Sequence, residues 1–270
     1  MENLTEFNIC EEVMSYQTLS YERKGYIGII DLNGPLDEQV KTSQLSDELA
    51  DLLAVIAWKN ETRVIILTGS GERPFSVSSD LIKEVWKISE QRRKGFWSLA
   101  EPIAKLDRPV IAAIKGDAIG QGLELALACD LRIATETSHF GFPQIMVGSI
   151  PWDGGTQRLS RLVGKPKAME MMLTGEIINA KEADRIGLIN KVVPPGDLMA
   201  VGMEMAREMA SRAPIALRYA KEAVHKGMDL TLEQGLRLEA DLYLLLHTTN
   251  DRAEGITAFR KKRTPQFKGR

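Results

Sequence analysis

The chain has 270 residues, of which 44% are hydrophobic and 27% charged, and its formal net charge is −2. This composition is ordinary for a globular protein, and the length favours one domain with a small appendage. The near-neutral charge excludes an extended basic surface for nucleic acid or for anionic membranes. No apolar stretch reaches the roughly 18 residues of a membrane-spanning helix, and the acidic start MENLTEFNICEE lacks a secretory signal pattern, so we expect a cytoplasmic protein.

Four short apolar strands are predicted in the first half of the chain, over residues 26–32, 64–68, 109–114 and 131–135. Leucines and alanines at helical spacing predict a helix over 39–58, and a second, interrupted helical segment is expected over 81–106. Short continuous apolar strands that alternate with helices are typical of a mainly parallel sheet that is buried on both faces. The expected fold class is therefore α/β.

From residue 156 onward the sequence shows a series of helical patterns, with no Pro/Ser-rich linker before them. We expect an α/β core over residues 1–200, of which 1–20 form an N-terminal arm, and a C-terminal helical region over 201–270. These last helices are expected to pack on the core or on a neighbouring subunit rather than to form an independent domain.

The cysteines and histidines indicate neither disulfides nor a metal site. Cys10 and Cys129 cannot form a disulfide framework, and Cys129 lies in the apolar run LALACDL, where a small buried side chain is expected. The three histidines lack metal-ligand spacing, and His139 is expected to be structural.

Two glycine-containing turns that follow predicted strands are candidate binding sites. They lie in GSGERPFSVSSDLIKE (69–84) and in KGDAIGQGLELALACD (115–130). A helix that begins near Gln121 or Gly122 presents unpaired N–H groups and the positive end of its dipole, which together favour an anion. The P-loop and Rossmann patterns are absent, so phosphate, carboxylate and oxyanion all remain possible ligands.

The segment KGDAIGQGLELALACDLRIATETSHFGFPQIMVGSIPWDGGTQRLSRLVG resembles the signature region of the crotonase (enoyl-CoA hydratase/isomerase) superfamily. The resemblance extends from about Tyr26 onward and includes PFSVSSDLIKE, LTGEIINAKEADRIGLINKVVP and EGITAFRKKRTPQFKG. It implies a crotonase-like core, a spiral of ββα repeats, with a helical C-terminal region used in trimerisation. It also implies a homotrimer or a dimer of trimers, a coenzyme A thioester as the substrate and no permanently bound cofactor.

By this resemblance, the thioester carbonyl is held in an oxyanion hole formed by the backbone N–H groups of Ser79 and Gln121. Each such donor stabilises the charge of an enolate-like transition state by about 3–4 kcal/mol. The sequence departs from the family at Gln121, where glycine is common, and at Ser78 and Ser79, where Gly-Ala is frequent. If Ser78 cannot adopt the backbone angles of glycine, the loop must differ.

Glu124 matches the first of the two catalytic glutamates of the hydratases, and Gln144 matches the second. A carboxamide can orient a water but cannot transfer a proton, and acid–base catalysis by each such group contributes about 10²–10⁴-fold. The usual two-glutamate hydration is therefore in doubt. Without the resemblance, Glu124 is equally well explained as a solvated acid in the first turn of a helix.

Trp152 and Asp153 stand where the family usually has small residues, just before Gly154-Gly155. Asp153 is a candidate replacement for the missing acid, since some isomerases and the naphthoate synthases of the family use an aspartate in this turn. It is equally well explained as a helix N-cap. Trp152 is expected either to reduce the acyl pocket, which would fit a cyclic or short substrate, or to be a packing residue.

For coenzyme A, the resemblance assigns contacts to a loop, to the start of a helix and to the C-terminus: Phe75, Val77, Ser78, Asp80, Gly122, Phe259 and Lys262. The two C-terminal residues often reach a CoA in the neighbouring subunit. The assignment of Lys262 is the weaker one, since a basic C-terminal helix is usually a solvated face.

The sequence therefore predicts an enzyme that forms a thioester enolate on an acyl-CoA, with Glu124 as its main acid/base. Hydration of an enoyl-CoA, with Asp153 or a water held by Gln144 as the partner, is the first expectation. A double-bond isomerase, which needs only one shuttling carboxylate, is the second, and an acyl-CoA hydrolase is the third. A CoA-binding paralogue that has lost activity is the non-enzymatic alternative.

Overall fold

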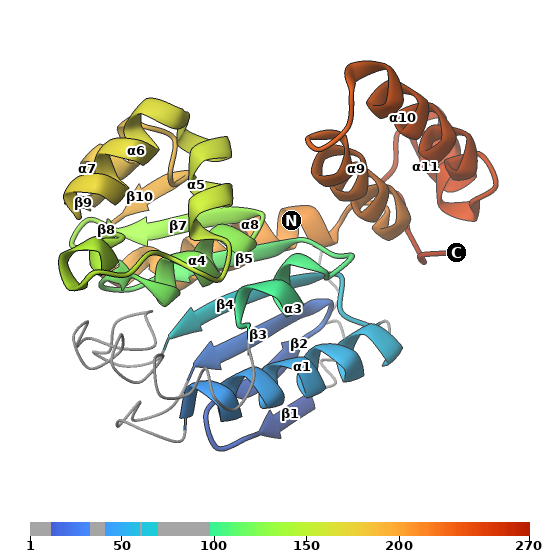
Figure 1. The fold of residues 1–270 in the computed structure, drawn as a ribbon. Helices are drawn as coiled ribbons and strands as arrows, with labels where there is room; N and C mark the ends of the chain where they lie inside the picture. The colour runs from blue at the N-terminus through green and yellow to red at the C-terminus, as the bar shows by residue number, and fades with distance from the viewer. Residues whose placement is uncertain (1–11, 33–40, 60, 70–97) are drawn as a thin grey trace.

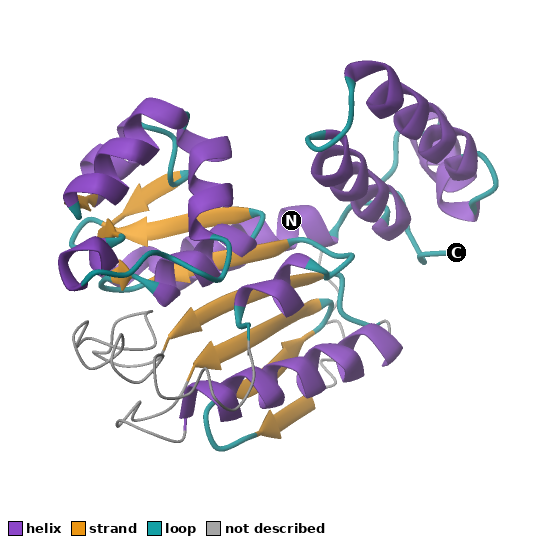
Figure 2. Ribbon diagram, viewed as in Figure 1, coloured by secondary structure: helices purple, strands orange, loops and turns teal. Residues whose placement is uncertain are grey.

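One large sheet organises the protein (Figure 1). A computed structural model describes residues 12–32, 41–59, 61–69 and 98–270. Within these ranges the sheet has seven strands in the order β1-β2-β3-β4-β5-β7-β10. They are β1 (Glu12–Ser15), β2 (Ser20–Lys24), β3 (Ile27–Leu32), β4 (Val64–Gly69), β5 (Val110–Ile114), β7 (Leu131–Thr135) and β10 (Lys191–Val193). The strands from β3 to β10 are parallel, whereas β1 and β2 form an antiparallel edge (Figure 2).

The four strands predicted from apolar runs are confirmed as β3, β4, β5 and β7. Every residue of β4 and β5 is buried, because helices cover both faces of the sheet. This burial explains why the strands read as continuous apolar runs without alternation. The helix predicted over 39–58 is α1 (Lys41–Lys59), and the described part of the predicted segment 81–106 contains α3 (Ala100–Ala104).

The described part of the predicted N-terminal arm belongs to the sheet instead. Residues 12–20 contain β1 and the first residue of β2, and the two strands pair in antiparallel register. Leu19 and Tyr21 are at most 1% exposed, and the Tyr21 hydroxyl shares a hydrogen bond of 2.7 Å with Thr62. This edge could not be predicted from periodicity, because SYERK and EVMS lack an apolar pattern.

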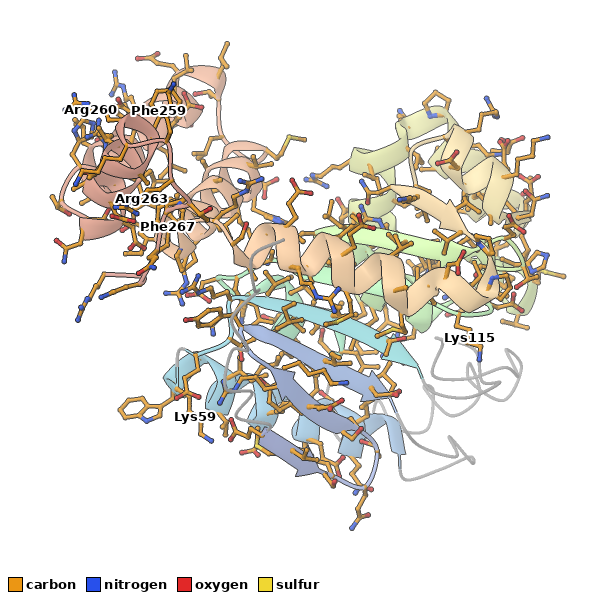
Figure 3. All side chains as sticks on the ribbon, turned by 180° about the vertical axis from the view of Figure 1, so that it is seen from behind. Lys59, Lys115, Phe259, Arg260, Arg263 and Phe267 are labelled. Carbon is orange, nitrogen blue, oxygen red and sulfur yellow. The ribbon has the colours of Figure 1, made fainter. Side chains whose placement is uncertain are left out.

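Helices form one layer on each face of the sheet. On one face α1 packs through Leu45, Leu49 and Leu52, none of which is exposed, next to α3 (Figure 1). On the other face lies α8 (Leu198–Ala210), which crosses the strands (Figure 3). A Cβ on Gly202 would lie 3.2 Å from Cδ1 of Ile133, so this glycine allows α8 to approach the sheet closely.

The boundary predicted between residues 200 and 201 is corrected by α8, because it falls inside this helix. Leu198, Ala206 and Ala210 are buried against the sheet, so α8 belongs to the core. The helices that stand apart are α9 (Pro214–Gly227), α10 (Leu232–Leu246) and α11 (Asn250–Arg260) (Figure 1). The C-terminal helical unit therefore begins at Pro214.

A second, small sheet is formed by strands that follow β5 in the chain. It contains β6 (Ala118–Ile119), β8 (His139–Gly141) and β9 (Ile177–Asn179). The remaining helices are α4 (Gln121–Ala128), η1 (Pro143–Val147), α5 (Gly155–Val163), α6 (Lys165–Thr174), α7 (Ala180–Arg185) and η2 (Pro195–Asp197). None of the helices in the described ranges is long and apolar enough to cross a membrane.

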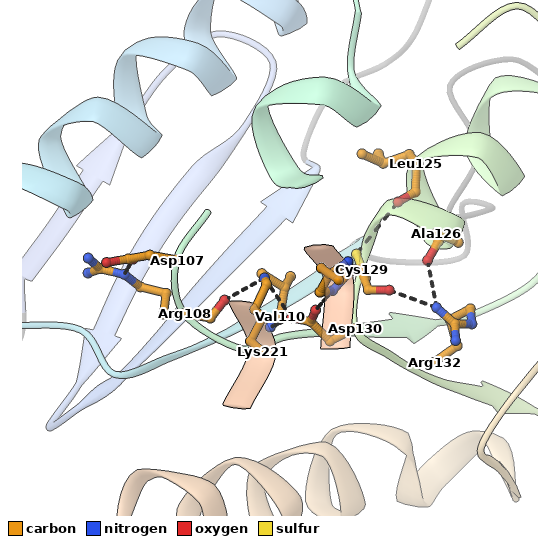
Figure 4. A network of polar contacts seen from close by, with 10 residues as sticks. Asp107, Arg108, Val110, Leu125, Ala126, Cys129, Asp130, Arg132 and Lys221 are labelled. Atoms are coloured by element: carbon orange, nitrogen blue, oxygen red, sulfur yellow. Dashed lines mark hydrogen bonds and ion pairs between the residues drawn. The ribbon is translucent and has the colours of Figure 1, made fainter. Parts of the chain in front are cut away.

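A charged network attaches α9 to the core (Figure 4). The Asp130 carboxylate accepts hydrogen bonds from the Val110 N–H at 2.7 Å and from Lys221 Nζ at 2.8 Å. Its other oxygen lies 2.7 Å from Nε2 of His225. Lys221 also donates to the carbonyl oxygen of Arg108 at 2.9 Å. The C-terminal unit is thus held partly by ionic contacts.

This network predicts an acid-sensitive contribution to stability. Burial raises the pKa of Asp130, but the hydrogen bond with His225 and the Lys221 ammonium outweigh burial, so the pKa lies below its ordinary value. The contribution is present in full above the unfolded-state pKa of about 4 and is lost as the pH falls through the lower folded-state value. We therefore expect Asp130→Asn to reduce the loss of thermal stability below about pH 4. Thermal unfolding over this pH range, with the exposed Asp241→Asn as control, tests this; an unchanged pH dependence in Asp130→Asn would refute it.

Candidate active site

The start of α4 presents backbone N–H groups. Gly120, just before the helix, has φ 60° and ψ −126°, a conformation that favours glycine. Its carbonyl oxygen accepts from the N–H groups of Leu123 at 3.0 Å and Glu124 at 3.1 Å. Within the described part of the chain, the N–H of Gln121 has no acceptor, as is usual at the first position of a helix. This N–H is a suitable donor for a developing oxyanion.

The carboxylate of Glu124 is held at the same end of α4. Glu124 is fully buried, and its Oε1 accepts hydrogen bonds from the backbone N–H groups of Asp153 at 2.6 Å and Gly155 at 2.9 Å. A buried carboxylate is costly unless hydrogen bonds stabilise it, and these two bonds do so. Glu124 is therefore a fixed internal carboxylate and not a solvated residue of a helix surface.

The turn over residues 151–155 has no room for a larger residue at Gly155. A Cβ on Gly155 would lie 2.8 Å from Cζ of Phe142, 2.8 Å from Cβ of Pro151 and 3.0 Å from Oε1 of Glu124. The preceding residue, Gly154, has φ 99°, which also favours glycine. The Gly-Gly pair is what allows the main chain to reach the Glu124 carboxylate.

Two buried amide side chains carry polar atoms without a partner in the described ranges. Gln144, in η1 after β8, is 8% exposed, and its Oε1 has no hydrogen bond there. Gln121 is 3% exposed, and its Nε2 likewise has none. An unsatisfied buried polar group costs about 1–3 kcal/mol. Such atoms are therefore candidates for binding a substrate or a water.

The Asp153 carboxylate contacts the start of α3. Its Oδ1 accepts a hydrogen bond from the Ser98 hydroxyl, and its Oδ2 accepts from the N–H groups of Leu99 at 2.9 Å and Ala100 at 3.0 Å. Its carbonyl oxygen accepts from Nη1 of Arg158 at 2.8 Å. Asp153 thus acts as a cap, but for a helix distant in sequence and not for α5, the helix expected from its position before GGTQRL.

The sequence model of the family described as "Enoyl-CoA hydratase/isomerase" matches residues 22–270. The chain belongs to this family. A relative from Bacillus subtilis, the putative enoyl-CoA hydratase/isomerase YngF, is 42% identical over 248 residues, which cover 90% of this chain and 95% of the relative. The short-chain-enoyl-CoA hydratase of Clostridium acetobutylicum is 36% identical over 262 residues, which cover 95% of this chain and all of that one.

The crystal structure of an enoyl-CoA hydratase from Bacillus anthracis superimposes on this family member with a TM-score of 0.83. It is 38% identical and covers 94% of this chain and 100% of that chain. The predicted fold class, a crotonase-like α/β core with a helical C-terminal region, is thereby confirmed, as is the family predicted from the sequence.

The structure brings one group of predicted site residues of this hydratase/isomerase family member together. Glu124 and Asp153 are in direct contact, and Gln121 and Gly122 lie in the same helical turn as Glu124. Trp152 is partly buried in the adjacent turn. The predicted residues of the first glycine-containing loop lie outside the described residues: Phe75, Val77, Ser78, Ser79 and Asp80.

Phe259 and Lys262 belong to the C-terminal helical unit and lie apart from these residues. Phe259, on α11, is 86% exposed, and Figure 3 shows it at the opposite end of the molecule from Lys115, which follows β5. Lys262 is exposed and has φ 52° just after α11. Figure 1 shows α11 well apart from α4 in the described part of the chain, so a CoA role for these two residues stays a prediction and would need a second subunit.

The structural interpretation of Cys129 is confirmed. Cys129 is buried at the end of α4, and burial raises the pKa of its thiol to about 12. A thiol with so high a pKa is not a nucleophile at neutral pH. Buried Arg132 lies beside it and donates to the Cys129 carbonyl oxygen at 2.7 Å (Figure 4).

Two contacts in the candidate site were not anticipated from the sequence. Ser98 carries no motif, and its contact with Asp153 joins residues 55 positions apart. Gly155 could have been recognised, because an adjacent glycine pair before a helical pattern indicates a close approach of the main chain.

Proposed function

We propose that this protein hydrates 2-enoyl-CoA thioesters, with Glu124 as the group that shuttles the proton. One observation carries the proposal: the fully buried Glu124 carboxylate, fixed by the N–H groups of Asp153 and Gly155, belongs to the same helical turn as Gln121, whose N–H has no acceptor in the described ranges. A base and an oxyanion donor so close together are the two elements that enolate chemistry needs.

The reaction requires one carboxylate and one water. The water gives a proton to Glu124 while its oxygen bonds to the β-carbon of the enoyl group. The π electrons move toward the thioester, and the charge that collects on the thioester oxygen is stabilised by the N–H of Gln121. We also assign Ser79 N–H to this oxyanion hole. Glu124 then returns the proton to the α-carbon, so one water is consumed and the carboxylate is regenerated.

Gln144 is proposed to orient the water. Its buried Oε1, which has no partner in the described ranges, can accept a hydrogen bond from a water O–H but cannot take the proton. A partly buried Trp152 in the turn beside Glu124 fits a short or cyclic acyl group. The relative from Clostridium acetobutylicum is named as a hydratase of short-chain enoyl-CoA, which supports the first of these.

The oligomer that we propose is a homotrimer or a dimer of trimers. The C-terminal unit exposes apolar side chains, among them Leu232 at 80%, Leu244 at 62% and Phe259 at 86%. Exposed apolar area of this kind is typical of surfaces that contact another chain. In such an assembly Phe259 and Lys262 would meet the CoA of a neighbour. We propose a cytoplasmic enzyme that needs no permanently bound cofactor.

The proposal is tested by comparing substrates. Purified protein is assayed with crotonyl-CoA, a 3-enoyl-CoA and a cyclic dienoyl-CoA, and the products are identified by mass spectrometry. We expect a 3-hydroxyacyl-CoA from a 2-enoyl substrate. Conversion of the 3-enoyl-CoA alone would instead establish a double-bond isomerase, which the single shuttling carboxylate also permits, and release of free CoA would establish a hydrolase.

Gln144→Glu tests whether the pocket is a working site or a decayed hydratase. In a working site that uses Glu124 and a held water, a second carboxylate changes the turnover of the preferred substrate by less than about tenfold. Steady-state rates of the variant and of wild type measure this effect. A wild type without activity, together with a gain of about 10²-fold or more on crotonyl-CoA in the variant, would favour a paralogue that has lost its acid.

A further inference from the structure

We propose that Asp153 is a positioning residue, which holds the Glu124 carboxylate in its reactive orientation by joining the turn over 151–155 to the start of α3. The proposal rests on the proposed function, in which Glu124 shuttles the proton. It differs from both roles considered for Asp153 from the sequence, which are a second proton-transferring acid and an N-cap of the helix that follows it.

The contacts of Asp153 divide between its side chain and its main chain. The carboxylate accepts three hydrogen bonds from the start of α3, from the Ser98 hydroxyl and from the N–H groups of Leu99 and Ala100. The N–H of the same residue donates to Oε1 of Glu124 at 2.6 Å. One residue therefore links the start of α3 directly to the proposed acid/base.

The anchor on α3 is itself well fixed. The Ser98 hydroxyl accepts from the Glu101 N–H at 2.8 Å while donating to Asp153, so the two side chains together cap α3. The carbonyl oxygen of Ser98 accepts from the hydroxyl of Ser46 on α1 at 3.0 Å. Since Asp153 is 7% exposed and its turn also contains Gly155, a displacement of its side chain would move both N–H donors of Glu124.

The same contacts oppose proton transfer by Asp153. Both oxygens of its carboxylate already accept hydrogen bonds from donors on α3. A group that transfers a proton must present an oxygen to the substrate, whereas both oxygens of Asp153 are directed at the donors at the start of α3. The amide oxygen of asparagine can accept hydrogen bonds as the Asp153 carboxylate does, but it cannot act as a base. Comparing aspartate, asparagine and alanine at position 153 therefore separates a positioning role from proton transfer.

The test compares Asp153→Asn, Asp153→Ala and wild type, using the fastest substrate among crotonyl-CoA, cinnamoyl-CoA and cyclohex-1-enecarbonyl-CoA. A positioning role predicts that Asn keeps kcat within about tenfold of wild type, since it retains an acceptor for the α3 N–H groups. Ala is expected to lower kcat by about 10²-fold through displacement of Glu124, with KM nearly unchanged. Equal losses of about 10²–10⁴-fold in both variants would show proton transfer and overturn the proposal.

A matched control separates positioning from general stability. Asn179→Ala removes another cap, because the Asn179 side chain accepts from the Glu182 N–H at 2.9 Å at the start of α7. We expect this variant to lose thermal stability while its kcat, measured well below the unfolding temperature, stays at the wild-type value. Unchanged kcat in Asp153→Ala as well would reduce Asp153 to a structural cap and overturn the proposal.

Two further readouts keep the test decisive. If Asp153→Ala does not fold, Ser98→Ala removes one of the three donors and is expected to lower kcat severalfold without changing KM; wild-type kcat there would count against the proposal. Amide hydrogen exchange of residues 151–155 needs no substrate, and faster exchange in Asp153→Ala or Ser98→Ala is expected.

Glu124→Gln, assayed in parallel, tests the proposed function separately. If this variant retains wild-type activity, the proposed function fails whatever the Asp153 variants show.

Discussion

Glu124→Gln is expected to lower kcat for enoyl-CoA hydration by about 10²–10⁴-fold with little change in KM. The amide keeps the shape of the side chain, and its oxygen can still accept from the N–H groups of Asp153 and Gly155, which bond Oε1 in the native protein. The fold should therefore persist while the proton carrier is lost. Gln144 already lacks a transferable proton, so no second acid at that position can compensate.

Steady-state kinetics on the purified variant measure this effect, with thermal unfolding as the test of folding. Glu136→Gln is a matched control, because Glu136 is an exposed glutamate that follows β7. It should behave like wild type. A Glu124→Gln variant that is folded and retains kcat within about tenfold of wild type would show that another group transfers the proton.

Gly155→Ala is expected to damage both stability and catalysis. The added Cβ would lie 2.8 Å from Phe142 Cζ and from Pro151 Cβ, and 3.0 Å from the Glu124 carboxylate, so the turn must shift. Overpacking of this kind costs about 1–3 kcal/mol of the free energy of unfolding. A shift of the turn also moves two hydrogen-bond donors of Glu124, and such misplacement lowers kcat by about 10²-fold.

Chemical denaturation and kinetics on the same preparation check both effects. Gly196→Ala is the control, since nothing lies within 4 Å of a Cβ at that position. It should change neither the free energy of unfolding nor kcat appreciably. If Gly155→Ala is destabilised but retains full kcat, the turn is a packing element and does not set the orientation of Glu124.

The elements that could be predicted from the sequence are those with a strong local pattern. The apolar runs of β4 and β5 and the helical spacing of leucines in α1 reflect burial against the sheet, so periodicity identified them. The edge strands β1 and β2 are polar and short, and only their pairing reveals them. The predicted domain boundary fell inside α8. The sequence shows where helical patterns follow one another, but these patterns do not show which of the helices packs on the core.

The candidate site follows the same rule. Glu124 and Gln121 lie in one helical turn, so their proximity could be predicted from spacing. The carboxylate of Asp153 lies against Ser98, Leu99 and Ala100, more than 50 positions away, and no local pattern encodes such a contact. For this reason two roles for Asp153 remained open from the sequence, a proton-transferring acid and a cap for α5. In the structure it caps α3 instead.

Hydration by a single shuttling carboxylate is tested most directly in heavy-oxygen water. Wild-type protein is incubated in this labelled water with crotonyl-CoA and, separately, with cyclohex-1-enecarbonyl-CoA. The masses of the products are then measured by mass spectrometry. We predict a 3-hydroxyacyl-CoA that carries one heavy oxygen at the β-carbon, formed by wild type and formed about 10²-fold or more slowly by Glu124→Gln. A shifted double bond without added oxygen, or free CoA with a heavy-oxygen carboxylate, would contradict hydration by this protein.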